Sequence, residues 1–178
     1  MLERIHTSEY LECSARSCKL EDNTEDFQTS EVYTFDVQKT IFFKTDKKRQ
    51  LVDITEDVER EIAKSKIAEG VVIVFARHTT CALIILEIED KLEEDFLNYF
   101  EKEGPKGPFS HSHGDYLAHD PKHAGKSHTP AHILSAIIGQ SVSIPLKNGQ
   151  MLLGTWQRIC LTEFDGPRKR EIMIQTLE

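Results

Sequence analysis

Six of the eight histidines in this 178-residue chain lie between Gly104 and His132. They are His111, His113, His119, His123, His128 and His132. Imidazole is the commonest metal ligand in proteins and the side chain best suited to proton transfer near neutral pH. Repeated Gly and Pro residues exclude a continuous helix or central strand here. Because such a long loop is usually either functional or disordered, the histidines either form a functional site or are solvent-exposed residues without a role.

His132 is the most informative of these histidines. Thr129 and Pro130 are typical of the N-cap and first position of a helix, and this would place His132 at the third helical position. There the helix dipole favours the neutral imidazole that a metal ligand or general base requires. A polar residue that only satisfies the helix end is an equally good interpretation.

His119 and His78 are the other candidate ligands. His119 lies on the approach to the expected helix, and His78 lies in a polar tetrad between two apolar segments. Three histidines brought together could hold a zinc ion with an open position for water or substrate. No compact spacing such as HExxH supports this, so a purely structural role stays open. The acidic residues that could orient ligands or act as general acid or base are Glu87, Asp95, Asp120 and Glu163.

Two further features could bind a ligand. Arg168, Lys169 and Arg170 follow an Asp-Gly-Pro turn and could bind a phosphate or carboxylate, or simply form a solvated basic turn. Trp156 could stack on a planar ligand, although a single Trp in a strand is usually part of the core. The sequence has no GxGxxG, GxxxxGK[ST], GxSxG or EF-hand motif, so kinase chemistry and serine hydrolysis are disfavoured.

Hydrophobic periodicity predicts the elements that must position these side chains. Strands are expected over 32–43, 51–54, 71–76, 81–86, 141–146, 151–164 and 171–177. Helices are expected after Thr55 as the N-cap and up to Gly70, over 88–100, and from Thr129 to Gly139. Asn148-Gly149 is the strongest hairpin signal. We therefore expect a β-rich α+β fold, a largely antiparallel, sandwich-like two-layer sheet with about three helices.

Composition narrows the class of protein. The chain is 39% hydrophobic and 29% charged, as in soluble globular proteins. Because no apolar run approaches the roughly 18 residues of a membrane span and no signal peptide is recognisable, we expect a cytoplasmic protein without membrane contacts. The net charge of -8 disfavours nucleic-acid binding but allows a small basic pocket for a phosphorylated metabolite. Cys13, Cys18, Cys81 and Cys160 form no CxxC pair, so free thiols are expected.

The chain divides into two parts. Residues 1–31 carry eight acidic and three basic side chains and no sustained hydrophobic period, which indicates a poorly ordered N-terminal extension. Residues 32–178 have the length and patterning of a single domain.

Five ordered blocks in residues 32–178 resemble the YjbQ-like family, often labelled secondary thiamine-phosphate synthase. They are RHTTCALIILE, LEEDF, YLAHD, HTPAHILSAIIG and NGQMLLGTWQRICLTEFDGPRKR. The resemblance implies a β-rich α+β fold that assembles as a homotrimer, with a polar site around recurring histidines and acids. On this chain these are His78, Asp95, His119 and His132, and Glu87, Gly154, Trp156, Gln157 and Glu163 also fall on recurring positions.

The resemblance also bears on two loop histidines and on the residue before Glu87. His123 and His128 fall in the family's variable segment, so the resemblance implies that they are bystanders. Many relatives have Asn before the acid at Glu87, where this chain has Leu86, a side chain that cannot form a supporting hydrogen bond.

The family label implies that a pyrimidine diphosphate is joined to a thiazole phosphate with release of pyrophosphate. The leaving diphosphate must be neutralised, usually by a divalent cation (zinc or magnesium) and basic side chains. The chain offers Arg77, Arg168 and Arg170 but no phosphate-cradling glycine loop, so we expect a weak activity and an unknown physiological substrate.

The resulting hypothesis assigns roles to seven positions. The catalytic candidates are His78, Asp95, His119, His132 and Glu163; the metal ligands are His78, His119 and His132; the phosphate-binding residues are Arg168 and Arg170. The alternative is a noncatalytic trimer whose histidines hold a metal or metabolite without turnover.

Overall fold

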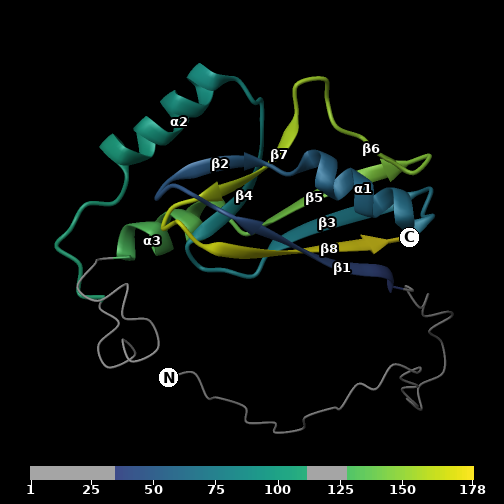
Figure 1. Cartoon of the computed structure of the whole chain (residues 1–178), viewed down its shortest axis with the longest axis horizontal. Helices are drawn as coiled ribbons and strands as arrows, with labels where there is room; N and C mark the ends of the chain where they lie inside the picture. The colour runs from purple at the N-terminus through teal and green to yellow at the C-terminus, as the bar shows by residue number, and fades with distance from the viewer. Residues whose placement is uncertain (1–34, 112–127) are drawn as a thin grey trace, which may run out of the picture. The chain divides into compact units, whose positions relative to one another are not determined.

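The computed structural model describes residues 35–111 and 128–178 (Figure 1). The expected acidic extension over 1–31 and His119 both lie outside the described residues. The elements follow the order β1 (Phe35–Lys44), β2 (Gln50–Asp53), α1 (Thr55–Ser65), β3 (Gly70–Ala76), β4 (Cys81–Leu86), α2 (Asp90–Glu103), α3 (Thr129–Ile138), β5 (Ser141–Lys147), β6 (Gln150–Met151), β7 (Arg158–Glu163) and β8 (Lys169–Leu177).

The strands form two antiparallel sheets. The five-stranded sheet has the order β1-β8-β3-β5-β6, and the three-stranded sheet has the order β2-β7-β4. Figure 1 shows β2, β7 and β4 stacked on one side of β1, β8 and β3. The predicted α+β class, antiparallel pairing and two layers are therefore confirmed.

The main core lies between the two sheets. Val72 and Val74 of β3 and Ile172 and Ile174 of β8 are buried from one face of the five-stranded sheet. They pack against side chains of the smaller sheet and of α1, which include Leu83, Ile159, Leu161, Val58 and Ile62. Each such side chain contributes roughly 1.5–3 kcal/mol to folding when it leaves water. The core therefore fixes the two sheets against each other, and with them the strand ends that carry the polar residues described below.

The other face of the five-stranded sheet, which we name the outer face, is exposed. Antiparallel pairing alternates side chains between the two faces, so Phe42, Val71 and Phe75 point away from the core. Their exposed fractions are 57%, 36% and 42%. Such a group of exposed apolar side chains on one face is typical of an interaction surface.

A second, smaller cluster fixes α3 on β4. Ala131 and Leu134 of α3 pack with Ala82 and Phe164, both of which are buried. Phe100 of α2 also contacts Phe164, with ring centroids 5.9 Å apart. The N-terminus of α3 is thereby held beside the end of β7. None of the described helices has the length and apolar character needed to cross a membrane.

Three local predictions are wrong. Thr55 is the first residue of α1, not its N-cap, because its hydroxyl donates to Asp53 (2.6 Å) and accepts from the Ile159 N–H. The helix ends at Ser65, with Lys66 in the left-handed conformation, so Gly70 begins β3. The expected strand over 151–164 is interrupted, because residues 152–157 form an irregular turn between β6 and β7.

The start of α3 also differs from the prediction by one residue. His128 holds the N-cap position, and the helix begins at Thr129. The His132 N–H accordingly donates to the His128 carbonyl at 3.1 Å, so His132 lies one turn after His128. The predicted end at Gly139 is confirmed, with a φ of 101° there.

Candidate functional site

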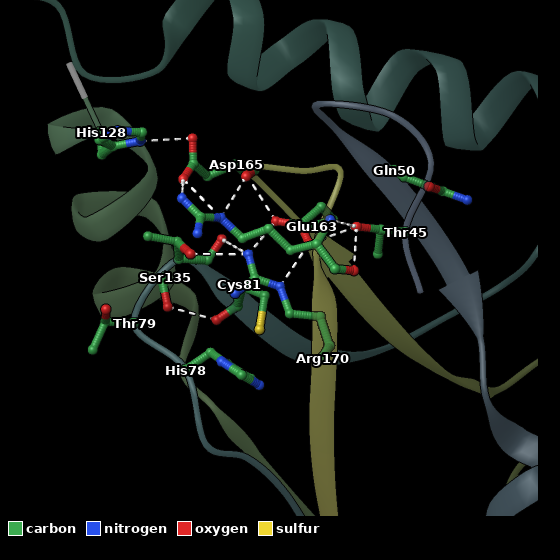
Figure 2. Close-up of polar contacts among 12 residues, drawn as sticks. Thr45, Gln50, His78, Thr79, Cys81, His128, Ser135, Glu163, Asp165 and Arg170 are labelled. Carbon is green, nitrogen blue, oxygen red and sulfur yellow. Dashed lines mark hydrogen bonds and ion pairs between the residues drawn. The ribbon is translucent and has the colours of Figure 1, made fainter. Parts of the chain in front are cut away.

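A polar pocket of about 320 Å³ lies where β4 begins and β7 ends. Three parts of the chain that are distant in sequence meet there: the β3–β4 connection, the N-terminus of α3, and the turn after β7 with the start of β8. The lining residues are Arg77, His78, Thr79, Thr80, His128, His132, Asp165, Arg168 and Arg170. Figure 2 shows several of these side chains converging from their separate elements.

The base of the pocket is a buried ion pair between Arg170 and Glu163. Arg170 donates through Nε to Glu163 Oε2 at 2.6 Å and through a terminal nitrogen to Oε1. The side chains are 3% and 0% exposed. Thr45 donates to the same carboxylate at 3.0 Å, and the Asp165 N–H donates at 2.8 Å. A carboxylate that accepts four hydrogen bonds from the protein holds the base of the pocket in shape.

Arg170 is also tied to the pocket wall. A terminal nitrogen donates to the Thr80 hydroxyl at 2.9 Å. Burial disfavours the charged guanidinium, but the hydrogen bonds from Arg170 to Glu163 outweigh it, and the pKa of Arg170 lies above its ordinary value. Arg170 therefore stays charged while being only 2% exposed.

Asp165 links His128 to Arg168. Its Oδ1 accepts from His128 Nδ1 at 2.8 Å, and its Oδ2 accepts from Arg168 Nε at 3.1 Å. Burial alone would raise the pKa of the Asp165 carboxyl, but the hydrogen bonds from Arg168 and His128 hold it below its ordinary value. A carboxylate on Nδ1 fixes the tautomer and orientation of the His128 ring, as in carboxylate–histidine pairs of enzymes.

The turn that presents Asp165 requires glycine at its next position. The Gly166 N–H donates to the Lys48 carbonyl at 2.9 Å. A Cβ on Gly166 would lie 2.2 Å from the Lys47 carbonyl oxygen, which no side chain could tolerate without movement of the backbone. The Asp-Gly-Pro sequence is thus a positioning element for Asp165 and Arg168.

His78 is held as a neutral ring with its proton on Nδ1. Its Nε2 accepts a hydrogen bond from the Glu171 N–H at 2.7 Å, which requires a lone pair on that nitrogen. Burial, with the nearby Arg170 charge, lowers the pKa of His78. His78 can therefore donate from Nδ1, and its Nε2 is already used by the protein.

His132 lines the pocket from α3. Its Nδ1 lies 3.1 Å from the Thr79 carbonyl oxygen. Because a carbonyl only accepts, Nδ1 carries the proton in this contact. The His111 ring meets the His132 ring edge to face, with centroids 5.2 Å apart, so a residue from the start of the long loop packs beside His132.

The structure brings together four of the predicted site residues, His78, His132, Arg168 and Arg170, and places Glu163 directly behind them. Asp95 is exposed on α2 and is not among the pocket residues. His119 lies outside the described residues, and its role stays a prediction. The interpretation of His128 as a bystander does not fit, because His128 is 4% exposed and bonded to Asp165. Its spacing of four residues from His132 places both on one helix face, and this signal was available in the sequence.

Of the three expected metal ligands, only His78 and His132 are among the described residues. Within residues 35–111 and 128–178, no three His, Cys, Asp or Glu side chains lie close enough together to hold a metal ion. The expected ligand His78 has Nε2 occupied by the Glu171 N–H, and His132 Nδ1 faces a carbonyl. The pocket presents a set of hydrogen-bond donors, which suits a ligand that carries hydrogen-bond acceptors.

The chain matches the family described as UPF0047 protein YjbQ-like over residues 39–178. It is 39% identical to a UPF0047 protein of Archaeoglobus fulgidus over 135 residues, 75% of this chain and 96% of that one. It is 32% identical to UPF0047 protein YugU of Bacillus subtilis, over 78% and 98% of the two chains.

Solved structures agree with these sequence matches. A hypothetical protein from Aeropyrum pernix K1 superposes with a TM-score of 0.68 at 32% identity, over 79% of this chain and 98% of that one. A YbjQ-like protein of unknown function from Sulfolobus solfataricus gives a TM-score of 0.66 at 32% identity, over 79% and 96%.

Proposed function

The chain belongs to the UPF0047 (YjbQ-like) family, and we propose that its polar pocket binds a small phosphorylated metabolite for an enzymatic reaction. The observation that carries this proposal is the convergence of three arginines and three histidines on one pocket of about 320 Å³. Guanidinium and imidazole N–H groups are the donors that recognise phosphate oxygens. The volume suits a small molecule and not a polymer.

In this proposal the pocket recognises an anion through oriented hydrogen-bond donors more than through an excess of positive charge. Each arginine has its own carboxylate: Arg77 pairs with Glu171 at 2.8 Å, Arg168 with Asp165, and Arg170 with Glu163. A guanidinium carries five N–H donors, and one carboxylate engages at most two of them. The ion pairs thus orient the guanidinium groups before the ligand arrives, which lowers the entropic cost of binding.

Among the arginines, Arg77 is best placed to meet a ligand. Its side chain is 56% exposed at the pocket rim, whereas Arg170 is buried beneath it. His78 Nδ1–H supplies a neutral donor close to the same backbone, since His78 and Glu171 are hydrogen-bonded. We assign Arg77 and His78 to the phosphate group of the substrate.

As the specific reaction we propose thiamine-phosphate synthase chemistry, with weak turnover. The C–O bond between the pyrimidine methylene and its diphosphate breaks, and the electron pair leaves with pyrophosphate. The thiazole nitrogen supplies the electron pair of the new C–N bond. The protein has to stabilise the growing negative charge and align the two reactants, which is what oriented guanidinium groups can do. No covalent intermediate is needed.

Binding is tested with inorganic pyrophosphate as the probe in titration calorimetry. Arg77→Gln should weaken binding about tenfold, since a charge-assisted hydrogen bond contributes about 1.5–3 kcal/mol before solvent screening. Arg60→Gln is the matched control, because Arg60 is 59% exposed and pairs with Asp57 at 2.8 Å but does not line the pocket. Equal losses in both variants would contradict the assignment.

Turnover is tested by following pyrophosphate release and thiamine phosphate formation from the two substrates. Activity that falls in His132→Ala supports an enzyme with this pocket as its site. Saturable pyrophosphate binding without product release would instead favour the noncatalytic metabolite-binding alternative.

We also propose that the protein assembles as a homotrimer through the outer face. The exposed Phe42 lies on β1, and the exposed Val71 and Phe75 lie on β3, with β8 between these two strands of the sheet. Burying them would remove apolar surface from water. Assembly would leave the three-stranded sheet and its helices on the outside of the trimer.

A further inference from the structure

Trp156 is held away from the core on a closed turn between β6 and β7. Its side chain is 70% exposed. The Gln157 side chain locks the turn, because its Oε1 accepts from the Gly154 N–H at 2.7 Å while the Gln157 N–H donates to the Gly154 carbonyl at 2.9 Å. A large aromatic ring kept in water by a rigid turn is unusual, because burying such a ring is strongly favourable.

The indole borders a pocket of about 250 Å³. Its lining residues are Asp53, Glu87, Ile88, Thr155, Trp156 and Arg158. Leu86 pairs with Arg158 in the ladder between β4 and β7, so Glu87 follows the strand directly beside the turn that carries Trp156. The phosphate pocket lies at the other end of the same two strands. Six residues of strand separate the ends by roughly 17 Å, so the two pockets are distinct.

The charges of this pocket favour a cation. Arg158 is already committed, since its Nε donates to Asp53 at 2.7 Å and a terminal nitrogen lies 3.5 Å from Glu56. Asp53 is committed as well, because it also accepts from the Thr55 N–H and hydroxyl. Glu87 is exposed and has no hydrogen-bond or ion-pair partner within the described parts of the chain. One carboxylate is therefore left to face a ligand.

We infer that Trp156 and Glu87 form a second small-molecule site, which takes a planar organic cation. The ring of the ligand would stack on the indole, whose face attracts positive charge, while Glu87 pairs with that charge. Ile88 and the stem of Arg158 supply the apolar floor for the edge of the ring. This inference does not depend on the proposed phosphate site.

The chain reports on this site directly, because Trp156 is its only tryptophan. N-methylpyridinium should quench the tryptophan emission saturably and without shortening its lifetime, as a stacked complex does. Pyridine has the same ring and is neutral at neutral pH, so it should bind at least fivefold more weakly. Glu87→Gln should weaken N-methylpyridinium about fivefold, the size expected for an exposed ion pair. Glu94→Gln, an equal change of charge on α2 outside the pocket, should have no effect.

Several results would overturn the inference. These are the absence of saturable quenching, equal affinity for pyridine and N-methylpyridinium, and unchanged binding in Glu87→Gln. A blue shift of the emission with rising protein concentration, without quenching by the cation, would show that a second copy covers Trp156. Calorimetry on Trp156→Ala, with the exposed Tyr99→Ala as control, gives an independent measure. Because both side chains are exposed, these variants should fold.

Discussion

The Nε2 atom of His78 accepts a hydrogen bond from the backbone N–H of Glu171, and the two atoms are 2.7 Å apart. The bond joins the β3–β4 connection to β8 and determines which ring nitrogen can carry a proton. A protonated imidazolium could not accept this hydrogen bond. The contact therefore couples the protonation of His78 to the attachment of the pocket wall.

This coupling predicts a dependence of stability on pH. The folded-state pKa of His78 lies below 6.5, lowered by burial and by Arg170. The unfolded chain thus binds the proton first as the pH falls, and the stabilisation present above pH 6.5 declines toward the lowered pKa. His78→Gln keeps an acceptor and does not titrate, so the urea midpoint of this variant should vary less over the range than that of the wild type.

His78→Ala separates the hydrogen bond from the titration. Loss of the acceptor leaves the Glu171 N–H without its partner, and the free energy of unfolding should fall by about 1 kcal/mol more than in His78→Gln. Equal stability of the two variants would show that the 2.7 Å contact contributes nothing.

The buried pair of Glu163 and Arg170 predicts a larger effect. Removing only one partner leaves an uncompensated charge in the interior, so Glu163→Gln should destabilise the fold by about 3–5 kcal/mol. The double variant Glu163→Leu, Arg170→Met should lose less than either matching single variant, because no unpaired charge remains. Urea unfolding of the single and double variants measures this. Additive losses would contradict a strong pair.

The sheets could be predicted from local patterns. Alternation in β1 and β8, apolar runs in β3 and β4, and the Asn148-Gly149 hairpin all depend on neighbours within a few residues. Asn148 and Gly149 indeed have φ values of 52° and 72°, the pair of positive angles that this dipeptide favours. The pattern was misleading at Trp156, because an apolar side chain in a turn gives the same signal as one in a strand.

The candidate site could be predicted only in part, because its contacts join distant positions. The family resemblance pointed to His78 and His132, but His128 bonds to Asp165, 37 positions away. Spacing cannot show such a pair, which depends on α3 docking against β4. The Glu163–Arg170 pair spans seven positions across a tight turn, and sequence alone does not show that both side chains point inward.

The pair of His128 and Asp165 predicts a measurable coupling. Asp165→Asn removes the carboxylate that orients His128, and His128→Ala removes the ring. Their effects on the free energy of unfolding should therefore differ from additivity by about 0.5–3 kcal/mol in a double-mutant cycle. A matched cycle on Asp57→Asn and Arg60→Gln, an exposed pair at 2.8 Å, should give a coupling below about 1 kcal/mol. Equal couplings would mean that burial adds nothing at Asp165.

The outer face predicts the assembly behaviour. Phe75 lies at the centre of the five-stranded sheet, on β3, and is 42% exposed. A charge at its position would have to be buried in any interface that covers this face. Phe75→Asp should therefore convert the proposed trimer to a monomer in light scattering coupled to gel filtration. Tyr99→Asp is the control, because Tyr99 is 61% exposed on α2 and should leave the mass unchanged.

A trimer that survives Phe75→Asp but dissociates in Tyr99→Asp would place the interface on α2 instead. Since an exposed side chain contributes little to the monomer core, both variants should keep their far-UV circular dichroism, so a loss of mass would report on assembly alone.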